Sequence, residues 1–231
     1  MNRLLRSVLP ATALLLLLSV FLPVQAKAQA GGLNEVLRRM ENHYKSLSSL
    51  KASVKMDQFT SQTGEHDVRE GDLIYIPQKG RDAAFRINWN KPSESLSVIN
   101  KQYVIYRPNL NVAYTGSVNS VKKEKGVNGS LALLNMSREE LKASYEISWV
   151  GQEDVSGGTS TIHILLVPRK AGSFKNADIW VDADGMPVQM KQTENNNDST
   201  TILLSGLTKN SSIDAKSIQV NVPKGTKIMK S

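Results

Sequence analysis

The stretch from Gly71 to Glu94, GDLIYIPQKGRDAAFRINWNKPSE, decides the fold of this chain. Its last third alternates between the apolar side chains of Phe85, Ile87 and Trp89 and the polar side chains of Arg86, Asn88 and Asn90. A period of two residues is typical of a β-strand with one apolar and one solvated face. The apolar face needs apolar surface opposite it, which either the rest of the protein or a ligand has to supply.

Residues 1–30 have the features of a cleaved signal peptide. Two arginines precede an apolar run of twelve residues bounded by prolines, whereas a membrane-spanning helix needs about 20. Small side chains place the cleavage site after Ala26 or Ala30. We therefore expect an exported protein with one mature domain, residues 31–231.

Composition excludes several classes of protein. The chain has no cysteine, so it contains no disulfide and no thioether-linked lipid anchor. With the three basic residues of the leader removed, 26 basic and 21 acidic residues remain, a net charge of +5. The basic residues are spread out, the densest group being Lys122, Lys123 and Lys125. A nucleic-acid-binding domain usually has a denser basic stripe, and we expect no nucleic-acid partner.

Periodicity predicts a β-dominated α+β domain. An amphipathic helix of about four turns, from Leu33 to Leu47, is followed directly by a strand from Leu50 to Met56. Further short apolar runs are separated by turn residues, including Asp184-Gly185, and favour an antiparallel sheet of roughly ten or eleven strands. The last predicted strand covers 218–222 and ends at a Pro/Gly turn.

A second helical region interrupts the strands. Its apolar residues are Leu131, Leu133, Leu134 and Met136, and the sequence Ser137-Arg138-Glu139-Glu140 that follows is a capping box. The lysine- and glycine-containing segment 121–128 precedes it and is typical of a loop. Two interpretations are open: a lid that can leave the sheet, or a core segment that is permanently packed.

No catalytic or metal-binding pattern is evident. The three histidines, His43, His66 and His163, do not have metal-ligand spacing and lie outside any nucleophile motif. We expect His163 to be a solvated residue on the face opposite Ile162 and Ile164. The chain is therefore not expected to be an enzyme, and no cofactor is predicted.

Several short motifs, in order along the chain, resemble the outer-membrane lipoprotein carrier protein family, LolA. They are Leu47-Ser48-Ser49-Leu50-Lys51-Ala52-Ser53, Gly71-Asp72-Leu73, Phe85-Arg86 with Pro92 and Ser93-Glu94-Ser95, Tyr106-Arg107-Pro108, Val167-Pro168-Arg169-Lys170, Ile179-Trp180-Val181-Asp182 with Gly185, and Ile213-Asp214-Ala215-Lys216 with Val222-Pro223-Lys224-Gly225.

The resemblance implies an open, unclosed antiparallel β-barrel whose concave, apolar side holds acyl chains under a helical lid. By this resemblance and by their alternation, the cavity residues are Phe85, Ile87, Trp89, Leu96, Val98, Tyr103 and Ile105. The lid corresponds to Leu131, Leu133, Leu134 and Met136. The family's arginine latch, which bonds lid carbonyls, corresponds best to Arg81, with Arg86 as the alternative; Asp82 stands where the family usually has proline.

The function implied is that of a monomeric periplasmic chaperone. It would accept lipoproteins from an inner-membrane ABC releasing complex and deliver them to an outer-membrane receptor. The alternative is a sensor or carrier of the same fold that binds a different lipid or lipoprotein.

Overall fold

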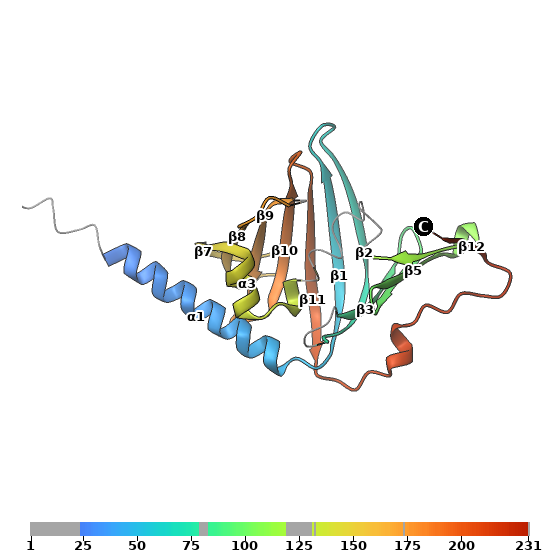
Figure 1. Ribbon diagram of the computed structural model, residues 1–231, viewed down its shortest axis with the longest axis horizontal. Helices are drawn as coiled ribbons and strands as arrows, with labels where there is room; N and C mark the ends of the chain where they lie inside the picture. The colour runs from blue at the N-terminus through green and yellow to red at the C-terminus, as the bar shows by residue number, and fades with distance from the viewer. Residues whose placement is uncertain (1–23, 79–82, 119–130, 132, 173, 231) are drawn as a thin grey trace, which may run out of the picture.

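One sheet of twelve strands forms most of the molecule in the computed structural model, which describes residues 24–78, 83–118, 131, 133–172 and 174–230 (Figure 1). The strand order is β12-β6-β5-β4-β3-β2-β1-β11-β10-β9-β8-β7. Neighbouring strands are antiparallel except for β12 and β6, which are parallel. Within the described residues no pairing joins β12 to β7. The predicted open, β-dominated architecture is therefore confirmed.

The strands fall into two groups along the chain. The first group is β1 (Leu50–Thr60), β2 (Glu65–Ile76), β3 (Ala84–Trp89), β4 (Glu94–Ile99), β5 (Gln102–Arg107) and β6 (Val112–Ser117). The second group is β7 (Tyr145–Val155), β8 (Thr159–Pro168), β9 (Phe174–Val181), β10 (Pro187–Glu194), β11 (Ser199–Lys209) and β12 (Lys227–Lys230). The helical elements are α1 (Val24–Ser46), α3 (Arg138–Ser144) and the short 3₁₀ segments η1 (Pro108–Leu110), η2 (Leu133–Asn135) and η3 (Ala215–Ile218).

Alternation along the strands gives the sheet an apolar inner face and a more polar outer face. In β1, Leu50, Ala52, Val54 and Met56 are buried while the residues between them are exposed. The ladder register places Ala52 opposite Leu73 of β2, and Leu73 opposite Ile87 of β3. Directly paired residues point to the same side of a sheet. The name "inner face" is used below for the side that carries Leu73 and Ile87.

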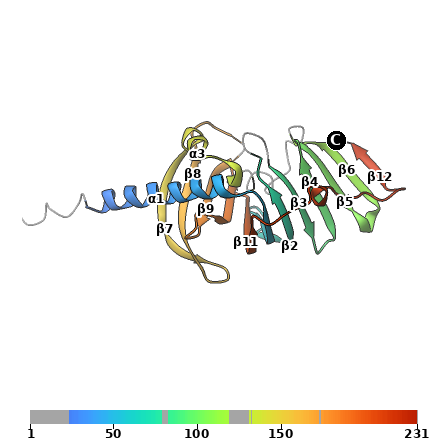
Figure 2. The same ribbon diagram turned by 90° about the horizontal axis from the view of Figure 1, so that it is seen from below.

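Helices cover part of the inner face. Helix α1 lies across the half of the sheet that contains β7 to β9, and α3 lies close to it (Figure 2). Val36, Leu37 and Met40 of α1 are buried in the same hydrophobic cluster as the inner-face side chains. The helix begins at Val24, so both predicted cleavage positions lie within it. Among the described residues, no helix is long and apolar enough to cross a membrane.

The two local capping and turn predictions are confirmed. Ser137 caps α3 and forms a capping box with Glu140 in which each side chain bonds the other's backbone N–H. The β9–β10 hairpin turns at Asp184-Gly185, where the Asp182 carboxylate accepts hydrogen bonds from the backbone N–H groups of Asp184 and Met186. Gly185 has φ +87°, a conformation that favours glycine.

The predicted last strand at 218–222 is wrong. The chain there forms η3, capped by Asp214, followed by irregular structure, and the final strand is β12 at Lys227–Lys230. The reason is that β11 already lies between β1 and β10, so the chain that follows has no free strand edge beside it. It continues to the far end of the sheet and pairs with β6 (Figure 1).

Candidate functional site

The seven residues predicted to line a cavity come together on the inner face of β3, β4 and β5. They are Phe85, Ile87, Trp89, Leu96, Val98, Tyr103 and Ile105. The register pairs Phe85 with Val98 and Val98 with Tyr103, and it pairs Ile87 with Leu96 and Leu96 with Ile105. Six of the seven are at most 7% exposed, and Ile105 is half-buried against them. The structure thus groups these residues, and their role as ligand contacts remains a prediction.

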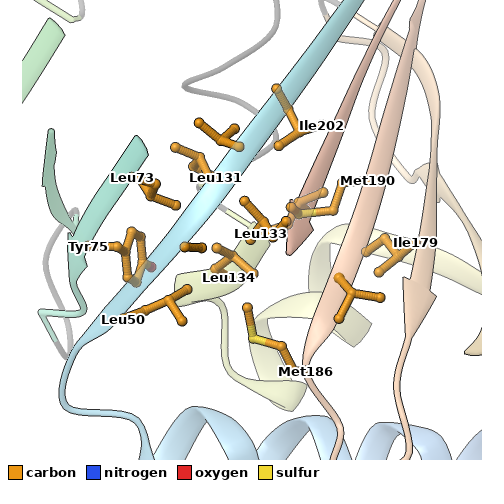
Figure 3. Packing of buried hydrophobic residues seen from close by; sticks show 14 of the residues in the cluster. Leu50, Leu73, Tyr75, Leu131, Leu133, Leu134, Ile179, Met186, Met190 and Ile202 are labelled. Carbon is orange, nitrogen blue, oxygen red and sulfur yellow. The ribbon is translucent and has the colours of Figure 1, made fainter. Parts of the chain in front are cut away.

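The predicted lid residues also lie in the interior. Leu131, Leu133 and Leu134 are between 1% and 6% exposed, and Met136 is half-buried against the same cluster. Figure 3 shows the three leucines among side chains of β1, β2 and β9 to β11. The labelled side chains around them are Leu50, Leu73, Tyr75, Ile179, Met186, Met190 and Ile202. The leucines therefore cover apolar side chains on the inner face of the sheet.

The interior is larger than the predicted cavity. Residues of β1 and β9 to β11 also contribute to the buried cluster, and Ile179, Met186 and Ile202 are fully buried. The sequence signal for β1 was its strict alternation from Leu50 to Met56. The contribution of β9 to β11 depends on the long-range pairing of β1 with β11, which alternation does not predict.

The segment after the predicted lid residues is bonded to α1. The backbone N–H of Arg138, in the first turn of α3, donates to the Glu41 carboxylate at 2.8 Å, and the Arg138 guanidinium donates to Asn34 at 3.3 Å. Lys45 and the Arg138 N–H hold the pKa of Glu41 below its ordinary value. A carboxylate at a helix N-terminus is favourable because it meets the positive end of the helix dipole. Helix α3 is thus held in place at its start, next to the buried leucines.

Two arginines were predicted as the latch, and the structure describes only one of them. Arg81 lies outside the described residues. Arg86 points to the outer face, where its Nη1 donates to the backbone oxygens of Gln219 (2.9 Å) and Ser217 (3.4 Å). Arg86 therefore holds the segment around η3 rather than the lid, which corrects the expectation that it could serve as the latch. The reason is strand parity: Arg86 lies between the inward-facing Phe85 and Ile87.

One end of the inner face carries charges. Glu94, whose side chain is only 8% exposed, lies between Arg107 (2.5 Å) and Arg69 (3.5 Å). The Arg107 guanidinium also lies over the ring of Tyr114, 5.3 Å from its centre. The bond to Glu94 raises the pKa of Arg107. A buried carboxylate requires such partners, because burying it unpaired would be costly. Apolar alternation in the sequence did not identify this cluster of charged residues.

His163 is not the solvated residue that was expected. It does lie on the outer face, but its side chain is only 13% exposed and stacks on Trp180 at 4.3 Å between ring centres. Its two ring nitrogens contact Glu153 (2.7 Å) and Asp178 (2.8 Å). Trp180, two positions from Asp178 on β9, covers the ring, and the sequence pattern gave no sign of this stacking. Within the described part of the chain, no group of three or more His, Cys, Asp or Glu residues is placed to hold a metal ion.

The sequence model of a known family matches most of this sheet. The family described as "Outer membrane lipoprotein carrier protein LolA" matches residues 47–220. The chain belongs to this family. The resemblance inferred from the motifs is thereby confirmed, and the LolA-family match spans all strands from β1 to β11. The comparison with curated protein sequences gave no significant match.

Two solved structures share the fold of this LolA-family chain. An uncharacterized conserved protein from Thermus thermophilus superposes with a TM-score of 0.54 and 11% identity, over 87% of this chain and 99% of that one. MucB superposes with a TM-score of 0.51 and 11% identity, over 81% of this chain and 62% of that one. The superpositions establish a common fold. At identities this low they say nothing about the ligand, which has to be argued from the chain's own residues.

Proposed function

We propose that this LolA-family chain is a periplasmic chaperone that carries lipoproteins from the inner to the outer membrane. It acts without catalysis, as a monomer exported by residues 1–30, and it shields the acyl chains of its cargo on the apolar inner face. Its partners are an inner-membrane ABC complex that releases lipoproteins and an outer-membrane receptor that accepts them. Support comes from the family match and from the apolar interior.

The observation that carries the proposal is the burial of Leu131, Leu133 and Leu134 against the inner face. Burying a CH₂ group contributes about 0.8 kcal/mol, so one chain of about 16 carbons would gain roughly 12 kcal/mol and would be hard to release. Moving three buried leucines into water costs about 5–9 kcal/mol. A lid that fills the empty interior therefore offsets much of the gain, which leaves an affinity suited to handing cargo on.

The residues assigned to this function keep their predicted roles. Phe85, Ile87, Trp89, Leu96, Val98, Tyr103 and Ile105 contact the acyl chains. Arg81 remains the proposed latch, so Arg81→Leu is expected to accept lipoprotein and to transfer it poorly, whereas Arg86→Leu transfers it normally. A guanidinium suits a latch because it can donate to several carbonyl oxygens at once.

The function can be tested with a variant in which Trp149→Phe and Trp180→Phe leave Trp89 as the reporter. Trp89 is 4% exposed on the inner face. Addition of a synthetic triacylated lipopeptide should shift its fluorescence, and the same peptide without acyl chains should not. Mass spectrometry of lipids and proteins that copurify from a detergent-free membrane extract should identify acylated lipoproteins.

Two results would change the conclusion. Copurification of phospholipid without lipoprotein would favour the alternative, a sensor or carrier of this fold with a different ligand. Absence of both a fluorescence response and a copurifying acylated molecule would exclude the carrier function.

A further inference from the structure

The hydroxyl of Tyr75 is buried without a hydrogen-bond partner. The Tyr75 side chain is fully buried, and its oxygen is one of six buried side-chain polar atoms in the described residues that have no partner. The other five belong to α1, α3, β9 and the segment after β11. Most buried polar groups in proteins are hydrogen-bonded, and each exception calls for an explanation. A phenylalanine would fill nearly the same space without leaving a hydroxyl unpaired.

The surroundings of Tyr75 are those of the proposed ligand site. The register places Tyr75 opposite Leu50 of β1 and opposite Phe85 of β3. It therefore lies on the inner face between the residues of β1 and the predicted cavity residues of β3. Figure 3 shows it in the cluster that contains Leu73 and the lid residue Leu134. Movement of the lid leucines would uncover this part of the cluster, and a ligand that replaced them would meet the hydroxyl.

The hydroxyl is available as a donor. Burial, with a smaller contribution from Tyr44 of α1, raises the pKa of Tyr75, so the group stays protonated at physiological pH. In an apolar environment, a hydrogen bond to such a donor is stronger than in water. An alkyl chain has no hydrogen-bond acceptor, whereas the ester or amide group that links an acyl chain to its headgroup has a carbonyl oxygen with two lone pairs.

We propose that Tyr75 recognises the carbonyl group of the bound acyl chain by donating a hydrogen bond to it. The protein would then bind acyl esters and amides more tightly than alkyl ethers or hydrocarbons of the same length. This inference rests on the proposed function, since it names the part of the acylated ligand that the site reads. The tyrosine completes its hydrogen bond when the ligand enters, which adds selectivity without adding a bond to the empty, closed state.

The test first compares two probes on two forms of the full chain, and a control variant and a third probe complete it. The probes are a dipalmitoyl ester lipid and a dihexadecyl ether lipid with the same headgroup, and the proteins are wild type and Tyr75→Phe. Tyr145→Phe is the control, because this half-buried tyrosine lies on β7 and stacks on Phe174. A third probe with an amide-linked acyl chain shows whether the ester or the amide carbonyl is preferred.

Wild type should bind the ester more tightly than the ether by about two- to tenfold, the worth of one hydrogen bond. Tyr75→Phe should lose this preference, keep its affinity for the ether and melt at or above the wild-type temperature. Tyr145→Phe should retain the preference. In wild type, the infrared carbonyl band of an isotope-labelled ester probe should move to lower frequency on binding, which checks the bond without relying on the variant.

The outcomes separate the two proposals. If wild type binds both probes and Tyr75→Phe has the same ester-to-ether ratio, the role of Tyr75 is excluded and the carrier function stands. If wild type binds none of the probes, the role of Tyr75 is excluded, and the response of Trp89 to the triacylated lipopeptide decides the carrier function separately. Loss of the preference in the Tyr145→Phe control would also overturn the assignment to Tyr75.

Discussion

Gly185 lies directly against the backbone of Arg39. A Cβ atom at Gly185 would be 2.3 Å from the Arg39 carbonyl oxygen, a distance that real Cβ atoms do not reach. The β9–β10 turn therefore touches the main chain of α1 and fixes where the helix crosses the sheet.

Gly185→Ala should destabilise the protein by about 2 kcal/mol or more, because the new methyl group clashes with α1 and the backbone is in the left-handed region. Chemical denaturation measures the loss. Gly157→Ala is the matched control, since Gly157 has φ +95° but open space around it. An equal loss in the two variants would show that backbone strain alone is responsible and that the contact with α1 contributes nothing.

Arg86→Leu should release the C-terminal segment from the outer face. The guanidinium bonds to Ser217 and Gln219 would be lost, at a cost of about 1 kcal/mol for a partly exposed group. Limited trypsin digestion should then cut faster at Lys216 and Lys224. Arg38→Leu, which removes an exposed guanidinium bonded to Glu35, should leave the cleavage rate unchanged. The same slow cleavage in Arg86→Leu would show that other contacts hold this segment.

His43 should make stability depend on pH. It is buried in α1, and burial, aided by Lys209, lowers its pKa from the ordinary value. The unfolded chain therefore binds a proton first, as pH falls below about 6.5, and the free energy of unfolding decreases by at most about 1.4 kcal/mol per pH unit until the folded-state pKa is reached.

Replacement of His43 by glutamine should flatten this slope between pH 7 and the folded-state pKa. Urea denaturation at a series of pH values measures it. His66→Gln is the control, because His66 is exposed and contacts Asp57 at the surface. An unchanged slope in His43→Gln would mean that other groups dominate the pH dependence.

Leu134→Ala distinguishes a lid from a permanent core segment. Removing a buried leucine side chain costs about 2–5 kcal/mol of stability in either case. If the segment is a lid, the closed state alone is weakened, and the affinity for a fluorescent acyl probe should rise as the melting temperature falls.

Leu166→Ala is the control for this comparison, because Leu166 is fully buried on β8 and not part of the lid. It should lower the melting temperature without raising probe affinity. Unchanged or weaker probe binding by Leu134→Ala would contradict the lid and leave the leucines as ordinary core.

The sequence by itself determined which side chains share a face. Alternation in a strand has a fixed period, so the parity of Phe85, Ile87 and Trp89 placed them together, and Arg86 on the other side, whatever the rest of the fold. Capping and turn chemistry is equally local, which is why the Ser137–Glu140 capping box and the Asp184-Gly185 turn were predictable.

Only the tertiary structure decided what lies against each face. The pairing of β1 with β11 brings Ile202 and Met190 into the same buried cluster as Leu133, and the position of η3 gives Arg86 its carbonyl partners. Parity could not forecast that Glu94 would be enclosed by two arginines or that Tyr75 would be left without a partner. Periodicity predicts the orientation of a side chain relative to its own strand. The neighbours of that side chain come from segments tens to hundreds of residues away, and only the packing of the whole chain brings these segments together.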